Sequence, residues 1–284
     1  MFSKKKSLLI FLLPGLMVMT IFYIFPFVGG MFHSLTDGTY SNGFVGFENY
    51  KKIWNNEMFL LGLRNTLELS LICTPLLWSI SFLIAFSIQE YKIQAGIIHF
   101  GILLPYMMPS STILLIWSLV FDYGGPLNRI IVGLGMERVM WMESAELRVP
   151  IILMFLWRNL GFCVTIFMAS LQTIPRPYYE YAEIEGAGFL TKIMQIALPI
   201  IQPTAYFIFV LSWINSFKIF KEVYFIAGAY PDYSVYTLQH YLNNMFTKLD
   251  YQNVTTAAYS FAAILFLAFG LIFVTRIKSS ENLY

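Results

Sequence analysis

Six long apolar stretches constrain this chain more than any other feature. They cover approximately residues 7–32, 66–88, 97–121, 150–172, 199–220 and 256–275. Each is long enough to cross a bilayer, because a helix needs about 20 residues to span the hydrocarbon core. Backbone polar groups in lipid must be paired within the segment, so we expect helices. The sequence predicts an all-α integral membrane protein with six transmembrane helices.

The composition excludes an ordinary soluble enzyme. Of 284 residues, 58% are hydrophobic and 12% are charged, whereas soluble domains carry about 25% charged residues. The formal net charge of +2 is too small to indicate a nucleic-acid partner. Cys73 and Cys163 both lie in apolar stretches, where we expect buried thiols. Two such residues can build neither a disulfide framework nor a metal cluster.

The distribution of positive charge predicts the orientation. Six crossings place both termini on one side of the membrane, and Lys4-Lys5-Lys6 precede the first stretch. Lys and Arg are also denser in the loops on that side, which indicates the cytoplasm. The first stretch is too long for a signal-peptide core and lacks a small-residue cleavage site. We therefore predict a multi-pass protein of the plasma or inner membrane, with both termini cytoplasmic.

Prolines and polar side chains interrupt the spans. Prolines are expected to kink helices and leave carbonyls that need partners; they are Pro14, Pro26, Pro75, Pro105, Pro109 and Pro203. Hydroxyls, amides and aromatic rings suit a sugar, and the candidate solute-pathway residues chosen by polarity are Tyr106, Ser110, Asn159, Ser212, Asn215 and Ser216. For each of them, the alternative to solute contact is a hydrogen bond to its own helix or to a neighbouring helix. Arg158 is interpreted as a snorkelling charge or a partner of Glu143 or Glu146.

Two other classes of membrane protein are weaker alternatives. A solitary secondary transporter or channel would need an internal repeat or a membrane-buried charge, and no predicted span has an acidic residue near its centre. An embedded enzyme is disfavoured because His33, His99 and His240 are scattered and the spans hold no paired acids. The chain also lacks a glycine-rich phosphate loop, so we do not expect it to hydrolyse ATP.

The segment 175–199, between the fourth and fifth stretches, is unusually ordered for a connector. Pro177 suits the first position of a helix, which the pattern predicts over 178–187. Glu180 and Glu183 lie in the first turns of this helix, where the helix dipole favours anions. A loop that only joined two spans would not need this organisation.

A glycine turn and a second helix complete that segment. Gly186 allows a tight turn, an amphipathic helix is predicted over 189–198, and Pro199 is expected to start the next span. Ala182, Gly186 and Ala187 would leave a flat patch for another protein. An amphipathic connector lying on lipid headgroups explains the pattern equally well.

A family resemblance decides between these readings. Glu180-Tyr181-Ala182-Glu183-Ile184-Glu185-Gly186-Ala187, followed by Ile196-Ala197-Leu198-Pro199, resembles the EAA loop of binding-protein-dependent ABC importer permeases. The spacing from glycine to Leu-Pro matches. The chain departs from the pattern at Tyr181, where alanine is usual, and at Glu185, where aspartate is usual.

Further motifs are similar to the MalF-like (carbohydrate uptake) sugar permeases. They include Leu13-Pro14-Gly15, Leu104-Pro105-Tyr106, Gly124-Gly125-Pro126-Leu127-Asn128 and Ser216-Phe217-Lys218. The resemblance implies the MetI-like fold of type I ABC importers. It also implies a complex with a second homologous permease, two cytoplasmic ABC ATPases and an extracellular solute-binding lipoprotein. ATP and Mg would be bound by the ATPases, with no cofactor on this chain.

The resemblance also assigns roles to residues. The ATPase-coupling residues would be Glu180, Tyr181, Ala182, Glu185, Gly186, Ala187, Leu198 and Pro199. The sugar contacts would be Tyr106, Ser110, Ser212 and Ser216, with Asn159 and Gly161. Residues 1–62 would form an N-terminal helix and an extracellular loop, 63–276 the permease core and 277–284 a cytoplasmic tail. The expected function is half of the pore of an ATP-driven importer of a sugar, in particular an oligosaccharide.

Overall fold

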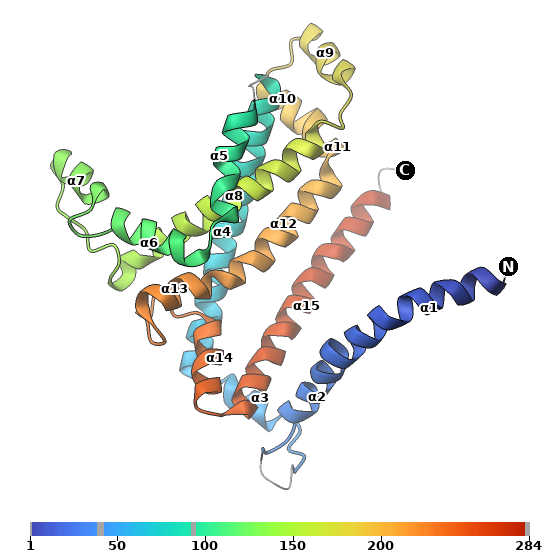
Figure 1. Cartoon of the computed structure of the whole chain (residues 1–284), viewed down its shortest axis with the longest axis vertical. Coiled ribbons are helices and arrows are strands. Elements are labelled where there is room, and N and C mark those ends of the chain that lie inside the picture. The colour runs from blue at the N-terminus through green and yellow to red at the C-terminus, as the bar shows by residue number, and fades with distance from the viewer. Residues whose placement is uncertain (1, 39–42, 92–94, 282–284) are drawn as a thin grey trace. The chain divides into compact units, whose positions relative to one another are not determined.

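The computed structural model describes residues 2–38, 43–91 and 95–281, and nearly all of its elements are helices (Figure 1). One antiparallel bridge joins Thr36 and Phe44. The predicted all-α class is therefore confirmed. Residues 282–284 of the predicted cytoplasmic tail lie outside the described residues.

The chain forms two compact units, residues 1–63 with 240–284, and residues 64–239. The first unit thus joins the two ends of the sequence, because the last helix packs with the N-terminal segments. The predicted segments 1–62, 63–276 and 277–284, with the roles assigned to them, stay predictions.

The first unit is built on a long N-terminal helix and the C-terminal helix. Its elements are α1 (Phe2–Met19), η1 (Thr20–Ile24), α2 (Phe25–Ser34), α3 (Glu48–Ile53) and α15 (Tyr251–Glu281). The Tyr259 hydroxyl donates to the carbonyl of Phe27, and their rings lie 5.2 Å apart. Gly30 permits this approach, since a Cβ there would lie 2.9 Å from the Tyr259 hydroxyl. Residues 11–29 are otherwise exposed and apolar, which is typical of a surface covered by lipid or another subunit.

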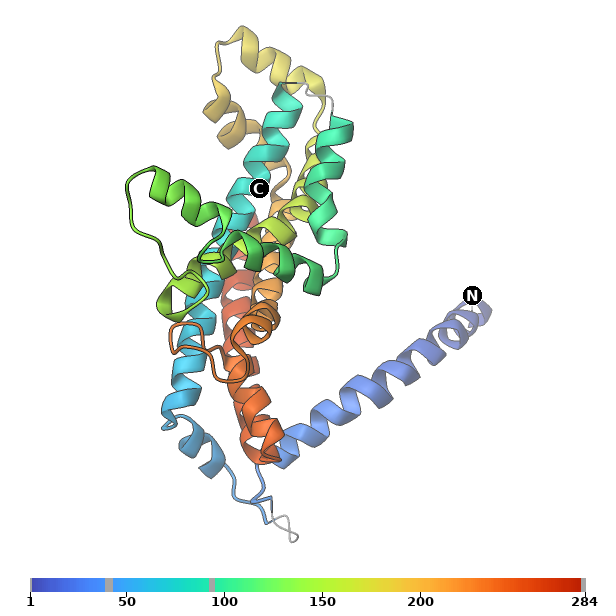
Figure 2. The ribbon, with the colours of Figure 1, turned by 60° about the vertical axis from the view of Figure 1, so that its left-hand side comes forward.

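The second unit is a bundle in which α4, α5, α8 and α12 lie side by side (Figures 1 and 2). Trp78 links α4 to α12 by donating to the carbonyl of Ala205 (2.7 Å). Its ring meets Phe167 of α8 edge-on, with centroids 5.7 Å apart. The helical elements of this unit are α4 (Glu57–Glu90), α5 (Ala95–Met107), α6 (Ser110–Val120), α7 (Pro126–Gly133), η2 (Ser144–Leu147), α8 (Arg148–Leu171), α9 (Arg176–Ile184), α10 (Phe189–Lys192), η3 (Ile193–Ala197), α11 (Leu198–Ile200), α12 (Gln202–Ser216), η4 (Phe217–Ile219) and α13 (Phe220–Ala227). Helix α14 (Leu238–Thr247) leads from this unit to the first.

Two of the predicted spans are broken. Four stretches of the described chain are long and apolar enough to cross a membrane: 11–34, 57–90, 148–171 and 251–270. Two bent pairs of helices raise the number to six if each pair is one span. Helix α6 leaves α5 at 108°, so 97–121 is not one continuous crossing. The break falls at Pro109, whose extended backbone (ψ 142°) ends one helix and begins the other.

Pro26 and Pro203 act differently from the predicted kinks, because each lies in the first turn of a helix. Pro203 lies in the first turn of α12, where its missing N–H removes no helical bond. An 85° bend separates the helical stretch 189–200, which contains Pro199, from the helix that begins at Gln202. Pro199 therefore precedes the bend, and the start of the fifth span at this residue stays a prediction. The π-helical segments η1 and η3 end two residues before Pro26 and Pro199. A wider turn there accommodates the proline and lets the helix continue.

Gly161 sets the approach of α8 to α5. A Cβ at this position would lie 2.1 Å from the carbonyl oxygen of Ile102 and 2.6 Å from Cα of Leu103. Only glycine lets the two backbones pack this closely. The family resemblance made Gly161 a pathway residue, and the structure gives it a packing role.

We expect Gly161→Ala to lower the stability of the protein. The added methyl must push α5 and α8 apart, and such overpacking costs about 1–3 kcal/mol. Thermal unfolding in detergent measures this as a lower melting temperature. Gly101→Ala in α5 is the matched control, because no atom lies within 4 Å of its Cβ position. Equal melting temperatures for both variants would contradict the packing role.

Candidate functional site

Helix α9 and the turn after it form a compact projection at one end of α4, α5 and α8 (Figure 1). Pro175 caps α9 and Pro177 is its second residue, one position later than predicted. Two hydrogen bonds form the turn that ends the helix. The Ala187 amide donates to the Ala182 carbonyl (2.8 Å), and the Gly186 amide donates to the Glu183 carbonyl (3.0 Å). This is a Schellman motif, and Gly186 has the positive φ (78°) that it requires.

The second half of the segment is helical to Ile200. It consists of α10, the π-helical η3 and α11, so the predicted helix over 189–198 is interrupted in its middle. Leu198 is partly buried and Pro199 is exposed. The bend after Ile200 then turns the chain into α12.

An ion cluster fastens α9 and α10 to the end of α4. Lys192 Nζ lies 2.5 Å from Glu90 Oε1 and 2.8 Å from Glu183 Oε1. Only 6% of the Lys192 side chain and 20% of the Glu90 side chain are exposed, so solvent screens this pair little. Glu183 is 61% exposed, so its contact with Lys192 is screened more. The cluster joins the last residue of α4 to both halves of the segment.

Aromatic packing reinforces this attachment. Phe86 of α4 lies 5.1 Å from the ring of Phe189 and 6.4 Å from that of Tyr179, measured between centroids. Burial and the nearby Glu90 carboxylate raise the pKa of Tyr179 to about 12. Tyr179 is therefore neutral at physiological pH and acts as an anchor within the protein.

The outer face of the projection is apolar and uncovered. Tyr178, Tyr181 and Ile184 recur every three residues along α9 and are exposed, Tyr181 by 71% and Ile184 by 82%. Leu190 of α10 and Met194 of η3 are exposed as well. We call these five residues the docking face. Apolar side chains this exposed on a helix that is held rigidly are typical of a protein interface.

The predicted coupling residues lie around this face. Glu180, Glu185 and Gly186 are exposed, whereas Ala182 and Ala187 are partly buried. The flat patch expected from Ala182 and Ala187 is therefore smaller than predicted. The large side chains Tyr181 and Ile184 make up the exposed face, and the residue spacing along α9 could have identified them.

A polar cavity of about 350 Å³ lies between α5, α8 and the α12–α13 segment. Three predicted pathway residues line it, namely Tyr106, Asn159 and Asn215. The rest of its wall is formed by Phe155, Arg158, Lys218, Ile219, Lys221 and Glu222. We call this space the pathway cavity.

Arg158 organises the pathway cavity. Its Nη1 donates to Ser110 Oγ (2.8 Å) and to Glu222 Oε1 (3.1 Å), and so joins α6, α8 and α13. The predicted pairing with Glu143 or Glu146 is wrong. Glu222 was missed because the predicted fifth span stopped at 220, whereas the helix continues and buries this carboxylate. The helical pattern of Phe220, Val223 and Ala227 could have extended it.

Ser212 and Ser216 do not line the pathway cavity. Ser216 Oγ donates to Ser70 Oγ of α4 (2.8 Å), and Ser212 Oγ lies 3.7 Å from Cys163 Sγ of α8. Both serines are buried, in the helix-joining role that was the alternative for each hydroxyl. Tyr106 lines the cavity, and its ring stacks on Phe162 with centroids 4.8 Å apart.

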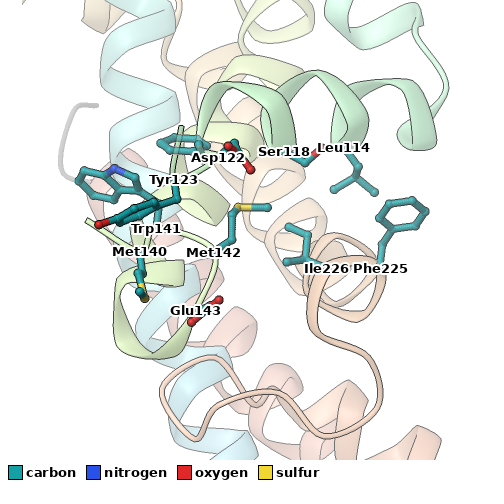
Figure 3. A pocket seen from close by; sticks show the side chains of 11 residues that line it. Leu114, Ser118, Asp122, Tyr123, Met140, Trp141, Met142, Glu143, Phe225 and Ile226 are labelled. Atoms are coloured by element: carbon teal, nitrogen blue, oxygen red, sulfur yellow. The ribbon is translucent and has the colours of Figure 1, made fainter. Parts of the chain in front are cut away.

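A second cavity, of about 580 Å³, lies among α6, the chain around Trp141 and α13. Figure 3 shows Tyr123 and Trp141 on one side of it and Phe225 and Ile226 on the other. Asn128 holds its wall by bonding both the amide (3.0 Å) and the carbonyl (2.8 Å) of Val139. This cavity was not predicted, because its residues are distant in sequence and have no periodic pattern.

Comparison with known proteins gives one family. Residues 79–279 match the family described as "Binding-protein-dependent transport system inner membrane component". The chain is 26% identical to the sulfoquinovosyl glycerol transport system permease protein of Agrobacterium fabrum, over 82% of this chain and 77% of the relative. It is 25% identical to the trehalose/maltose transport system permease protein of Thermococcus litoralis, over 96% and 94%.

A solved structure shares the fold. It is a chain of a bacterial alginate ABC transporter in complex with an alginate pentasaccharide-bound periplasmic protein. The TM-score is 0.79 at 22% identity, and the match covers 95% of this chain and 93% of the other.

Loss of the Lys192 charge is expected to loosen the projection. In Lys192→Met, Glu90 and Glu183 repel each other and α9 loses its link to α4. Hydrogen–deuterium exchange should accelerate several-fold for the amides of 176–192. Glu185→Gln, which alters an exposed carboxylate of the same segment, should leave exchange unchanged. Unaltered exchange in Lys192→Met would contradict the role of the ion cluster.

A double-mutant cycle tests the Arg158–Glu222 pair. Arg158→Gln leaves a buried carboxylate without its charge partner, a change that costs up to about 3–5 kcal/mol. We expect the added Glu222→Gln substitution to recover part of the lost melting temperature, because a neutral amide is cheaper to bury. Purely additive losses would show that the two residues do not interact.

Proposed function

We propose, from the premise that this chain belongs to the family of binding-protein-dependent transport system inner membrane components, that it is a pore-forming permease of an ATP-driven sugar importer. As a member of this family it is a multi-pass inner membrane protein and a transport subunit without a catalytic role of its own. The proposed substrate is a sugar, in particular an oligosaccharide. The sulfoquinovosyl glycerol, trehalose/maltose and alginate systems named above support this choice.

The docking face is the observation on which the proposal rests. Tyr178, Tyr181 and Ile184 place apolar groups on a short rigid helix, and such a helix fits a cleft in a partner protein. The partner is a cytoplasmic ATPase, which binds the ATP and Mg. The complex contains two ATPases, a second homologous permease and an extracellular solute-binding lipoprotein. The periplasmic protein bound in the alginate transporter supports the last of these.

Movement of the ATPases would reach the membrane through the Lys192 cluster. A rigid shift of α9 pulls on Glu90 and hence on the end of α4, rather than bending a flexible loop. Helices α4, α8 and α12 are joined by buried hydrogen bonds and rings, so they respond as a body. Alternating access by rigid-body movement follows from this connection.

The pathway cavity is then the place where solute passes. With the termini and α9 in the cytoplasm, Arg158 lies in the outer half of α8, because the cytoplasmic end of that helix is Leu171. Tyr106 offers a stacking face, and Asn159 and Asn215 offer amides for sugar hydroxyls. Ser110, Gly161, Ser212 and Ser216 support this wall through packing and hydrogen bonds.

The experiment is a substitution on the docking face. Ile184→Glu should abolish both copurification of the ATPases and ATP-dependent uptake, because a charge replaces an apolar contact in a buried interface. Loss of such a residue costs about 2 kcal/mol or more, close to thirtyfold in Kd. Folding should be unaffected, since Ile184 is 82% exposed.

The matched control is Leu134→Glu, at the end of α7 and also exposed. It should leave ATPase binding intact. Normal ATPase binding and uptake in Ile184→Glu would refute the coupling proposal and favour a helix that lies on lipid headgroups. Uptake that continues without ATP would favour a solitary transporter instead.

A further inference from the structure

The wall of the pathway cavity has more positive than negative charge. It contains Arg158, Lys218 and Lys221 against the single carboxylate of Glu222. Arg158 neutralises Glu222 in the ion pair at 3.1 Å. Lys218 Nζ donates to a neutral acceptor, Asn215 Oδ1 (2.9 Å). Among the described residues, neither Lys218 nor Lys221 lies within ion-pair distance of a carboxylate. The charge of Lys221 also acts on Glu222, but three cationic groups against one carboxylate leave an excess of positive charge at this cavity.

Those lysines stand where a membrane protein disfavours them. They follow the outer end of α12, and positive residues near the ends of spans are concentrated on the cytoplasmic side. A cavity wall between packed helices also has a lower dielectric constant than water, which strengthens the attraction of an anion. Both side chains are exposed, so their ammonium groups are accessible, and the excess of positive charge at this cavity favours an anionic ligand.

We propose that the transported sugar is acidic and that Lys218 and Lys221 receive its anionic group. A carboxylate, phosphate or sulfonate on the sugar meets their ammonium groups, and Asn159, Asn215 and Tyr106 contact its hydroxyls and ring. The Arg158–Glu222 pair keeps the one acidic side chain from repelling this group. The inference rests on the proposed function and narrows its substrate to anionic sugars.

The same ammonium groups could instead hold an anionic lipid headgroup. Lysine side chains at the end of a span often reach toward headgroups, and acidic lipids attract them. Both ligands supply an anionic oxygen, so the experiment must separate a solute from a lipid.

Uptake by the complete importer, with both permeases, the ATPases and the binding protein, is the test. Proteoliposomes of phosphatidylcholine are offered a mixture of pectin, alginate and starch oligosaccharides with sn-glycerol 3-phosphate, and mass spectrometry identifies what accumulates with ATP. We expect the accumulated solutes to be anionic. Lys218→Gln and Lys221→Gln should each lower their uptake about tenfold, the loss of one charge-assisted contact.

Two further variants exclude a folding defect. Lys218→Arg combined with Lys221→Arg keeps both charges and should retain uptake. Lys248→Gln, at an exposed lysine outside the cavity, should have no effect.

The outcomes are distinct. Accumulation of starch oligosaccharides alone would overturn the acidic-sugar inference and leave the importer proposal standing. Normal uptake in both lysine variants, with a lysine effect that appears only in vesicles containing phosphatidylglycerol, would overturn it in favour of a lipid site. No ATP-dependent accumulation of any sugar would refute the importer proposal and this inference with it.

Discussion

Lys192 brings together two carboxylates that lie far apart in the chain, Glu90 at the end of α4 and Glu183 in α9. The Lys192–Glu90 pair is largely buried, and the cluster attaches the segment after α8 to the end of α4. In the proposed complex, the exposed side chains of α9 meet the partner in one orientation because this attachment holds them in place. Without it, a force applied to α9 would be dissipated in the connections on either side, and the spans would not follow the partner.

The breaks in the helices determine which polar side chains form the wall of the pathway cavity. Pro109 ends α5 and redirects α6, and the bend at Ile201 redirects α12. Each break exposes backbone groups that lipid cannot satisfy, so it must lie against protein or beside water. The break at Pro109 brings Ser110 to Arg158, and helix continuation beyond Ser216 brings Glu222 to the same arginine. The polar wall of the pathway cavity is therefore a consequence of where the helices are broken and where they continue.

The charged side chains around the pathway cavity fall into two groups, an ion pair and two further lysines. Glu222 and Arg158 neutralise each other, which makes their burial tolerable. Lys218 and Lys221 are exposed and add positive charge to the cavity wall, which is why an anionic solute is proposed. Neutral amides and an aromatic ring beside them suit the remainder of a sugar. A permease with this wall would discriminate by charge first and by hydroxyl pattern second.

The sequence by itself determined the membrane class, the number of apolar segments and the ordered segment with its glycine turn. These depend on local properties, namely hydropathy over about 20 residues and the backbone freedom of Gly186. The sequence also pointed to Tyr106, Asn159 and Asn215, because amides and hydroxyls are conspicuous among apolar neighbours.

Only the tertiary structure decided which polar groups meet. Arg158 finds Glu222 and not Glu143 or Glu146, and Ser212 and Ser216 join helices rather than line the cavity. Gly161 emerges as a packing residue because Ile102 lies against it. Such pairings depend on contacts between segments tens of residues apart, and no local pattern contains that information. The same reason explains why Lys192, an ordinary lysine in the sequence, is the residue that ties the projection to the bundle.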